Sequence, residues 1–379
     1  MDSRSHLTRF GIFYAALYAA VAVHYPLFPV YLKLREFSPS RIGLLVGAVE
    51  IAGMTGPLLV SPWADRRGTF RAIMAVLLLA AAGSLALLAR FSLFPLVLAA
   101  SFSYGLTLKT VLPLSDALAG RALADASGNY GKVRLWGTVS FIVVSLMLPL
   151  TGLTDTAPGL MRLFLIALAV LIPILAVAPA ASGGRTTARV SAEASDRLPS
   201  GFYAFLALGF LGNIGLGIYQ SFGPLFFAQL FGPSRVSLLF ALSGLVEIPV
   251  MALGGRMFLR LGHRKMLMAA WTAMTLRLLV MAFLPIRIPV LLGQTTHALC
   301  YGFFFLAGID WVNRTVPAGL RALGMGLFMA VCFSAAQFLG GVAGGFLLEF
   351  GGFSLLFGLA SIAPAAAAVL LLLNPKVKP

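Results

Sequence analysis

The sequence predicts an all-α membrane protein whose twelve transmembrane helices form two pseudo-symmetric six-helix bundles. Of its 379 residues, 60% are hydrophobic and only 11% are charged, whereas a soluble domain is about 45–50% apolar and about 25% charged. Twelve apolar runs follow one another, each close to the roughly 17–25 residues that a membrane helix needs. One polar stretch divides these runs into two groups of six. Together these observations exclude a soluble enzyme, a disordered chain and a disulfide scaffold.

The apolar runs are the predicted spans, and several contain the Pro and Gly that membrane helices tolerate when neighbours satisfy the freed backbone groups. The first run is expected to be a retained helix and not a signal peptide, because it lacks a small-residue cleavage site and continues into another span. The runs cover residues 10–32, 40–62, 72–89, 93–119, 133–150, 160–178, 202–230, 236–258, 266–284, 289–312, 322–347 and 353–373.

The formal net charge of +16 would suggest nucleic acid in a soluble protein, but most Lys and Arg fall between the apolar runs. The side that holds both termini carries most of them, so the positive-inside rule places both termini in the cytoplasm. The charge is therefore mainly a topology signal, with attraction to anionic membrane lipid as a secondary effect, and no nucleic-acid partner is expected. The inner side has Arg4, Arg9, Arg66, Arg67, Arg71, Arg121, Lys132, Arg134, Arg185, Arg189, Arg197, Arg260, Arg264, Lys265, Arg314, Arg321, Lys376 and Lys378. The outer side has Lys33, Arg35, Arg41, Arg90, Arg162, Arg235 and Arg287, the first three of which run against the rule locally.

The longest polar stretch, residues 181–200, is expected to be a cytoplasmic linker. It joins an N-terminal six-helix bundle, residues 1–180, to a C-terminal six-helix bundle, residues 201–379. The halves echo each other, because Val-Glu-Ile at 49–51 recurs at 246–248 and a short basic loop follows each copy. Two six-helix halves related by an internal repeat are a transporter architecture.

The two basic loops carry a resemblance to a known family. Residues 61–71 resemble the loop of the major facilitator superfamily that reads Gly-x-x-x-Asp-Arg-x-Gly followed by basic residues, although Ser61 replaces the leading Gly. The second copy, residues 255–265, has Leu259 where the Asp would stand. The resemblance implies a conformational gate on the cytoplasmic side, formed by Asp65, Arg66, Gly68 and Arg71.

Further segments resemble the branch of this superfamily that contains lactose permease and the phenylpropionate permease-like transporters. Asp116 and Arg134 are 18 residues apart, which matches the carboxylate and arginine that bind sugar in lactose permease. Arg277 and His297 are 20 residues apart, as are the arginine and histidine of its proton-coupling group. Cys300 stands where that permease has a glutamate, so the resemblance implies a secondary transporter without carrying over its coupling chemistry or its galactoside specificity unchanged.

Seven ionisable residues fall inside the predicted spans. A charge at the centre of a bilayer costs about 2.5–3.5 kcal/mol even on the lenient insertion scale. Each of these residues is therefore expected to face a partner or a cavity, either as a structural ion pair or as part of a substrate or ion site. They are Glu50, Lys109, Asp116, Glu247, Arg277, His297 and Asp310.

We expect Lys109, Asp116 and Arg134 to form the N-terminal half of a substrate site. Lys109 and Asp116 are two turns apart on one helix face, and Lys109 has no counterpart in lactose permease. The guanidinium of Arg134 suits a bridge to Asp116 or a bidentate clamp on a carboxylate or on sugar hydroxyls. The alternative for Arg134 is one more basic residue on the cytoplasmic side that only helps to set the topology. The positive charge of Lys109 favours anionic solutes.

We expect proton coupling to involve Glu247, Arg277, His297 and Glu50. Glu50 and Glu247 occupy equivalent places in the two halves, and a carboxyl group in a low dielectric takes up a proton more readily. Glu247 is the first candidate carrier, with Arg277 as its partner and His297 as a hydrogen-bonding or relay group. A neutral His297 satisfied by a neighbouring helix is the alternative, and for Asp310 a structural pair with a loop arginine is favoured.

Small and sulfur-containing residues are expected to serve packing. The pairs Gly340-Gly341 and Gly344-Gly345 are spaced for close helix approach and not for phosphate binding, because the chain has no Walker motif. The 13 Met residues are interpreted as gap-filling side chains. The two cysteines, Cys300 and Cys332, lie inside apolar runs, so neither a disulfide framework nor a metal site is expected.

The sequence thus indicates a secondary transporter that moves a small organic solute in symport with protons. The candidate solutes are an organic or aromatic carboxylate and a sugar or glycoside. A proton-antiport exporter of drugs or metabolites is the alternative, although residues 135–150 lack the Gly-Pro-rich pattern of that branch. We expect no enzymatic activity and no cofactor besides the coupling proton. The resemblance implies a monomeric, multi-pass protein of the bacterial inner membrane.

Overall fold

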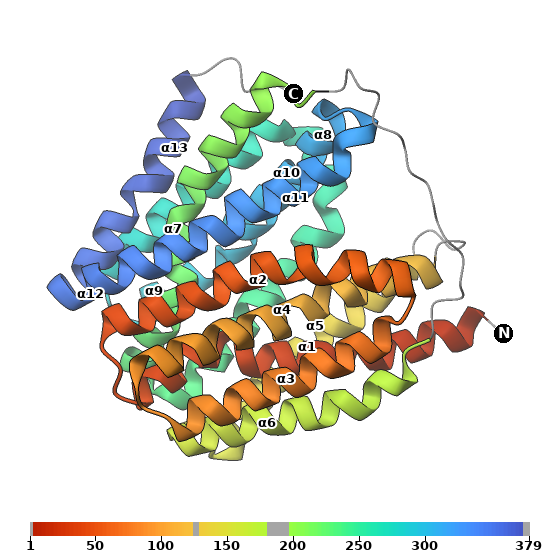
Figure 1. The fold of residues 1–379 in the computed structure, drawn as a ribbon. Helices are drawn as coiled ribbons and strands as arrows, with labels where there is room; N and C mark the ends of the chain where they lie inside the picture. Colours follow the sequence, from red (N-terminus) through yellow and green to blue (C-terminus); the bar gives the residue numbers. More distant parts are fainter. Residues whose placement is uncertain (1–2, 124–128, 180–196, 374–379) are drawn as a thin grey trace. The chain divides into compact units, whose positions relative to one another are not determined.

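The computed structural model describes residues 3–123, 129–179 and 197–373, and nearly all of them are helical (Figure 1). Within this part of the chain, eleven helices are long and apolar enough to cross a membrane. The last, Leu323–Leu373, has 51 residues, and its backbone leaves the helical region at Gly351 and Gly352. At about 1.5 Å per residue this run is more than twice as long as a bilayer core is thick. It therefore contains two spans, which gives the twelve that the sequence predicts.

Contacts within the chain define two compact units. The first holds the described residues of Met1–Phe37, Leu44–Thr186 and Phe227–Ala241. The second holds those of Ser38–Gly43, Thr187–Phe226 and Leu242–Pro379. Most of the predicted linker, residues 181–196, lies outside the described residues.

The helices of the first unit pack in a consistent order. The first helix contacts the fifth and sixth, and the third contacts the fourth and sixth. Thr156 caps the start of the sixth helix, since its hydroxyl accepts a hydrogen bond from the Gly159 amide at 3.2 Å. The helices are α1 (Ser3–Leu34), α2 (Pro39–Arg67), α3 (Phe70–Arg90), α4 (Phe94–Ala122), α5 (Asn129–Met147) and α6 (Ala157–Ile174).

The position of Arg35 has a local structural explanation. Its guanidinium donates hydrogen bonds to the carbonyl oxygens of Leu88 at 2.6 Å and Phe91 at 3.0 Å, at the C-terminal end of α3. A cation at this end of a helix interacts favourably with the unpaired carbonyls and the helix dipole. This basic residue, which the positive-inside rule would not favour on its predicted side of the membrane, therefore caps a helix.

The second unit contains two π-helical segments and two helix breaks, of which the one at Gly351 and Gly352 is described above. Gly262 has φ 69° and divides the long helix α8, while the π-helices Ala298–Phe303 and Ala330–Ala335 continue neighbouring α-helices. The α-helices are α7 (Ser200–Phe231), α8 (Val236–Phe283), α9 (Arg287–Thr295), α10 (Phe304–Thr315), α11 (Arg321–Met329), α12 (Ala336–Ala360) and α13 (Ile362–Leu373). The widened π turns change which side chains share a helix face.

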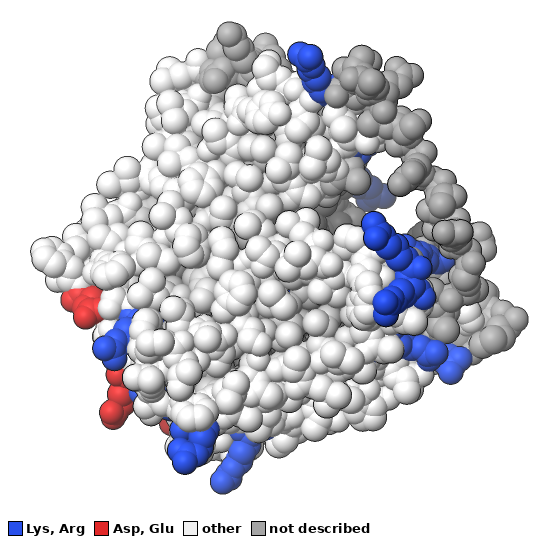
Figure 2. Space-filling view, viewed as in Figure 1, with Lys and Arg blue, Asp and Glu red and all other residues white. Residues whose placement is uncertain are grey.

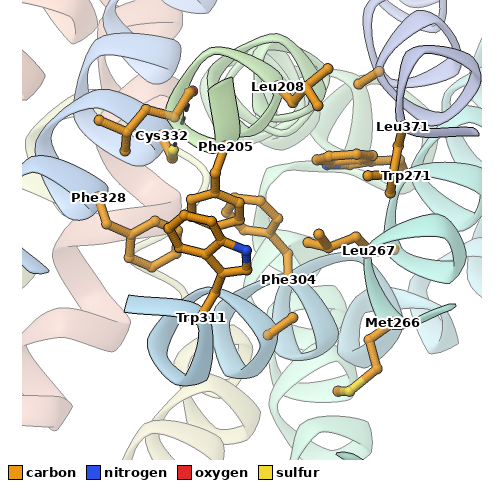
Figure 3. Close-up of a cluster of buried hydrophobic side chains, with 14 of the residues drawn as sticks. Phe205, Leu208, Met266, Leu267, Trp271, Phe304, Trp311, Phe328, Cys332 and Leu371 are labelled. Carbon is orange, nitrogen blue, oxygen red and sulfur yellow. Dashed lines mark hydrogen bonds between the residues drawn. The ribbon is translucent and has the colours of Figure 1, made fainter. Parts of the chain in front are cut away.

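Aromatic rings dominate the core of the second unit (Figure 3). The rings of Phe205 and Trp311 stack with their centroids 4.6 Å apart, and Phe328 stacks on Phe205 at 5.8 Å. Cys332 is buried beside them, and its thiol donates to the carbonyl oxygen of Leu206 at 3.7 Å. This cysteine serves packing, in agreement with its place in an apolar run.

Glycine allows α7 and α12 to approach each other closely. A Cβ atom added to Gly340 would lie 2.7 Å from the amide nitrogen of Ile218 and 2.9 Å from the carbonyl carbon of Gly217. A Cβ atom on Gly217 would lie 2.6 Å from the carbonyl oxygen of Ala336. The expectation that the glycines after residue 339 serve close helix packing is confirmed for Gly340.

The surface has the character of a membrane protein. The surface in view in Figure 2 is largely uncharged, and the few charged side chains lie near its edge. Large hydrophobic side chains are exposed on the molecule, such as Val76 on α3, Trp136 on α5 and Phe346 on α12. Soluble monomers rarely expose apolar patches of more than a few hundred Å², so this surface fits contact with lipid.

Candidate functional site

In the first unit, side chains from α1 and α5 converge on the carboxylate of Asp116 in α4. The hydroxyl groups of Tyr14 in α1 and Tyr130 in α5 donate to Asp116 Oδ1 at 2.7 Å and 2.9 Å. Arg134 Nη1 donates to both carboxylate oxygens at 3.3 Å. The bridge between Asp116 and Arg134 that the sequence suggests is therefore present.

This cluster remains accessible although it lies on membrane-spanning helices. The side chain of Arg134 is 41% exposed and that of Asp116 is 34% exposed. The Arg134 guanidinium also lies 5.3 Å from the ring centroid of Tyr18, in a cation–π arrangement. A charged pair that is lined by tyrosines and partly exposed suits a polar solute, because its hydrogen-bonding groups can be reached from outside the protein.

The second ion pair of the first unit joins Glu50 in α2 to Lys109 in α4. The Glu50 side chain is 7% exposed and that of Lys109 is 30% exposed. Gly53, one turn after Glu50, makes room for the lysine, because an added Cβ atom would overlap the Lys109 side chain. Lys109 thus pairs with Glu50 of α2. Asp116, which lies two turns further along the same face of α4, pairs with Arg134 of α5.

In the second unit, the charged side chain of Arg277 in α8 is buried, with only 2% of the residue's surface exposed. It donates to the hydroxyl oxygen of Tyr219 at 2.6 Å, to Gln294 Oε1, and to His297 Nδ1 at 3.3 Å. Its guanidinium carbon lies 3.8 Å from the ring centroid of Tyr219. The sequence spacing of Arg277 and His297 therefore corresponds to a direct contact.

Gln294 is the hydrogen-bonding centre of this second cluster. Its side-chain oxygen accepts from the hydroxyl groups of Tyr219 at 2.9 Å and Ser243 at 3.1 Å, in addition to Arg277. Because a guanidinium has no acceptor, Nδ1 of His297 must accept from Arg277, which requires a neutral imidazole protonated on Nε2. The expected alternative of a neutral histidine bonded to a neighbouring helix fits this geometry.

The remaining coupling candidate, Glu247, is half-buried on α8. Its role as proton carrier stays a prediction, as do the coupling roles of Glu50, Arg277 and His297.

The predicted gate lies at the end of α2. Gly68 has φ 67°, a left-handed conformation that ends the helix. Arg71 Nη1 donates to the carbonyl oxygens of Ala176 and Ala178, both at 3.2 Å, at the C-terminal end of the sixth span. Arg66 is exposed, and the side chain of Asp65 lies outside the described residues. The gating role of these residues stays a prediction.

Asp310 has the structural partner that the sequence favours. Its Oδ2 atom lies 2.6 Å from Arg314 Nε and 2.7 Å from His263 Nε2. His263 follows Gly262, where α8 is broken. This cluster ties the start of one span to the end of another, and within the described ranges no group of three or more His, Cys, Asp and Glu side chains suits a metal ion.

Sequence reasoning missed the neutral members of both clusters. Tyr14, Tyr219, Ser243 and Gln294 carry no charge, so a search for ionisable residues inside spans does not find them. The available signal was spacing, because Gln294 precedes His297 by three residues and therefore shares its helix face.

The comparisons with known proteins identify the family. The model described as the MFS_1 like family matches residues 7–359. The chain belongs to this family of the major facilitator superfamily.

Several relatives cover nearly the whole chain. The probable 3-phenylpropionic acid transporter of Escherichia coli (strain K12) is 26% identical over 97% of this chain and 96% of its own length. The maltose permease of Geobacillus stearothermophilus is 27% identical over 90% of this chain and 88% of its own length. Among solved structures, the nucleoside transporter NupG has a TM-score of 0.84 at 17% identity and covers 98% of this chain and 99% of its own.

These matches show the fold and the general function. The protein has the all-α fold of the major facilitator superfamily and is a multi-pass membrane transporter of a small-molecule substrate, not an enzyme. The resemblance to the phenylpropionate permease-like branch that the sequence indicated is confirmed.

Proposed function

We propose that this protein is a proton-coupled symporter that imports a small organic solute across the bacterial inner membrane by alternating access. The observation that carries the proposal is that buried charges lie on the membrane-spanning helices of both compact units. Such charges are costly in a membrane and mark substrate or ion pathways. The two moving bodies are the bundles 1–180 and 201–379, and both termini lie in the cytoplasm.

The solute in this proposal is an organic or aromatic carboxylate, or a sugar or glycoside. Relatives are named for 3-phenylpropionic acid, maltose and nucleosides, all of which are small organic solutes. Asp116, Arg134 and Lys109 form the substrate site of the first unit. The accessible Arg134 guanidinium favours an anion, whereas the tyrosine-lined Asp116 also suits sugar hydroxyls.

Protons are the coupling ion in this proposal, and Glu247, Glu50, Arg277 and His297 are the coupling group. The pair between Glu50 and Lys109 supports this assignment, because protonation of the carboxylate would remove its charge and release the lysine. The carboxyl of Glu247, in the equivalent place of the other half, is the first candidate carrier. The protein acts as a monomer.

The test is uptake into proteoliposomes that carry purified protein, with and without an imposed pH gradient. We expect a radiolabelled solute from a panel of carboxylates and sugars to accumulate only when the outside is more acidic. Glu247→Gln should abolish this accumulation and leave exchange of internal for external solute intact, and Glu36→Gln, at an exposed carboxylate outside the spans, is the control. Accumulation without a gradient would refute proton coupling, and efflux driven by inward proton flow would show an antiporter.

A further inference from the structure

Among the described residues around Arg277, one acceptor atom receives three hydrogen bonds and two buried N–H groups have no acceptor. Gln294 Oε1 accepts from Tyr219, Ser243 and Arg277, although an amide oxygen has only two lone pairs. Arg277 Nε and Gln294 Nε2 are buried and have no hydrogen-bond partner among the described residues. Three donors that converge on one atom fix the orientation of the Gln294 amide, so a flip of the amide does not remove the excess.

In the same cluster, the acceptors that the described residues offer to the buried positive charge of Arg277 are uncharged. Arg277 donates to a tyrosine hydroxyl, an amide oxygen and a neutral imidazole, the side chains of Tyr219, Gln294 and His297. Neutral acceptors replace the hydration of a buried cation only in part. An anion next to Arg277 would offset this cost. It would also accept hydrogen bonds from the N–H groups of Arg277 Nε and Gln294 Nε2, which have no partner among the described residues.

A row of aromatic rings leads away from this charge along the helix face. The ring of His297 stacks on Tyr301 with centroids 5.8 Å apart and an interplanar angle of 3°, and Tyr301 stacks on Phe305 at 5.6 Å and 10°. Phe333 meets Tyr301 edge-on at 5.8 Å. All four side chains are half-buried, so part of each ring surface remains uncovered.

Both helices that carry these rings are widened at this level. Tyr301 belongs to the π-helix Ala298–Phe303, and Phe333 belongs to the π-helix Ala330–Ala335. Such π-helical turns occur frequently at functional sites. Two of them at one row of half-buried rings indicate that this face is shaped for more than helix packing.

We propose that this cluster is a substrate subsite for a small aromatic carboxylate. The carboxylate accepts hydrogen bonds from Arg277 and from Gln294 Nε2, since a guanidinium and a carboxylate match in geometry and charge. The aromatic ring of the solute packs against the row formed by His297, Tyr301 and Phe305. This inference rests on the proposed transport function and narrows it, because a sugar supplies neither the negative charge nor the aromatic face.

The first test measures binding to the purified, detergent-solubilised wild type by thermal stabilisation over a range of ligand concentrations. The probes are benzoate, phenylacetate and 3-phenylpropionate, each with its uncharged amide and its saturated cyclohexyl carboxylate as matched analogues. We expect at least one aromatic carboxylate to bind about tenfold or more tightly than both of its analogues, as the loss of a charged hydrogen bond or of ring stacking predicts. Equal binding of the amide, or of the cyclohexyl analogue, would overturn the proposal.

Variants then test the two ends of the subsite. Arg277→Gln should weaken binding by about 10- to 100-fold, the loss expected for a charged hydrogen-bond donor, and Arg277→Lys should restore part of it. Tyr301→Leu should weaken binding of the aromatic acid but not of its cyclohexyl analogue, and Tyr301→Phe, which keeps an aromatic ring, should retain most of the affinity that Tyr301→Leu loses. Arg287→Gln, at an exposed arginine that begins α9, is the control. Unchanged binding in folded Arg277→Gln and Tyr301→Leu would refute the subsite.

Failure of this inference can be told apart from failure of the proposed function. Proton-driven uptake of a sugar, with no stabilisation by any aromatic carboxylate, would leave the symport proposal standing and refute the subsite. Stabilisation that is lost in Arg277→Gln, without proton-driven uptake, would support the subsite and refute proton symport.

Discussion

At the scale of single residues, Asp116 shows how a carboxylate is kept in a defined geometry inside a helical bundle. Tyr14 is fully buried and donates the shortest of the hydrogen bonds that reach Asp116, at 2.7 Å. A hydrogen bond to a charged group contributes more to stability than a neutral one, about 1.5–3 kcal/mol. Tyr14 therefore orients the carboxylate, while the partly exposed Arg134 remains able to meet a solute.

The hydroxyl of Tyr14 provides a direct test of this arrangement. Tyr14→Phe removes one donor to Asp116 and keeps the ring, so we expect the affinity for the transported solute to fall by about tenfold while the protein stays folded. The concentration dependence of uptake into proteoliposomes measures this change. Tyr203→Phe, at an exposed tyrosine of α7, is the control. Equal affinity in Tyr14→Phe and the wild type would mean that Asp116 does not contact the solute.

The pair between Glu50 and Lys109 depends on the absence of a side chain at Gly53. A Cβ atom there would overlap the Lys109 side chain, so we expect Gly53→Ala to move the lysine away from Glu50 and to lower proton-driven uptake at least tenfold. Gly120→Ala in α4, where an added Cβ atom meets nothing within 4 Å, should transport normally. The two variants are compared by initial rates under the same pH gradient. Wild-type rates in folded Gly53→Ala would exclude this pair from coupling.

The sequence predicted the charged contacts that fall at a recognisable spacing and missed the others. The bridge between Asp116 and Arg134 was suggested, and Arg277 and His297 were placed in one group, because their spacings match those of a known branch. Glu50 and Lys109 meet across two helices, and no local spacing rule joins such residues. Gln294 was missed because a neutral amide costs less free energy inside a membrane than a charged side chain does, so its presence in a span does not by itself indicate a site.

At the scale of helices, the sequence predicted the spans well and their irregularities poorly. The twelve apolar runs follow from hydropathy, which depends only on local composition. The π-helices near Tyr301 and Phe333 contain no Gly-Pro signal, and they depend on packing between helices that are distant in sequence. The break in α8 falls at a glycine, Gly262, but many other glycines of this chain lie inside continuous helices, so a glycine alone does not predict a break.

The contact between α7 and α12 gives a prediction for helix packing. Because the atoms nearest to Gly340 belong to the backbone of α7, Gly340→Ala must push the two helices apart, at a cost of about 1–3 kcal/mol as for other overpacked sites. Thermal unfolding in detergent should show a lower midpoint for this variant. Gly326→Ala in α11, where an added Cβ atom meets nothing within 4 Å, should unfold at or above the wild-type midpoint. A wild-type midpoint in Gly340→Ala would contradict the close approach.

At the scale of the whole molecule, charge and hydropathy act together. The apolar composition sets the membrane environment, and the uneven distribution of Lys and Arg sets the orientation within it. Arg35 illustrates why the rule is applied to the sum of the charges, because this arginine, predicted on the outer side, has a local role in capping α3. The fold class was predictable from the succession of apolar runs and the internal repeat, whereas the arrangement of each site required the contacts between helices.

The orientation can be tested with single introduced cysteines, because both native cysteines are buried. Leu259 is 83% exposed and lies in α8 just before its break at Gly262, within the basic segment that the positive-inside rule places in the cytoplasm. Arg287 is exposed at the start of α9, on the side that the rule places outside. We expect a membrane-impermeant maleimide to label Arg287→Cys in intact cells and Leu259→Cys only after permeabilisation, with the wild type unlabelled in both. The opposite labelling pattern would place the strongly basic segments outside the cell. The positive-inside rule would then not determine how this chain inserts.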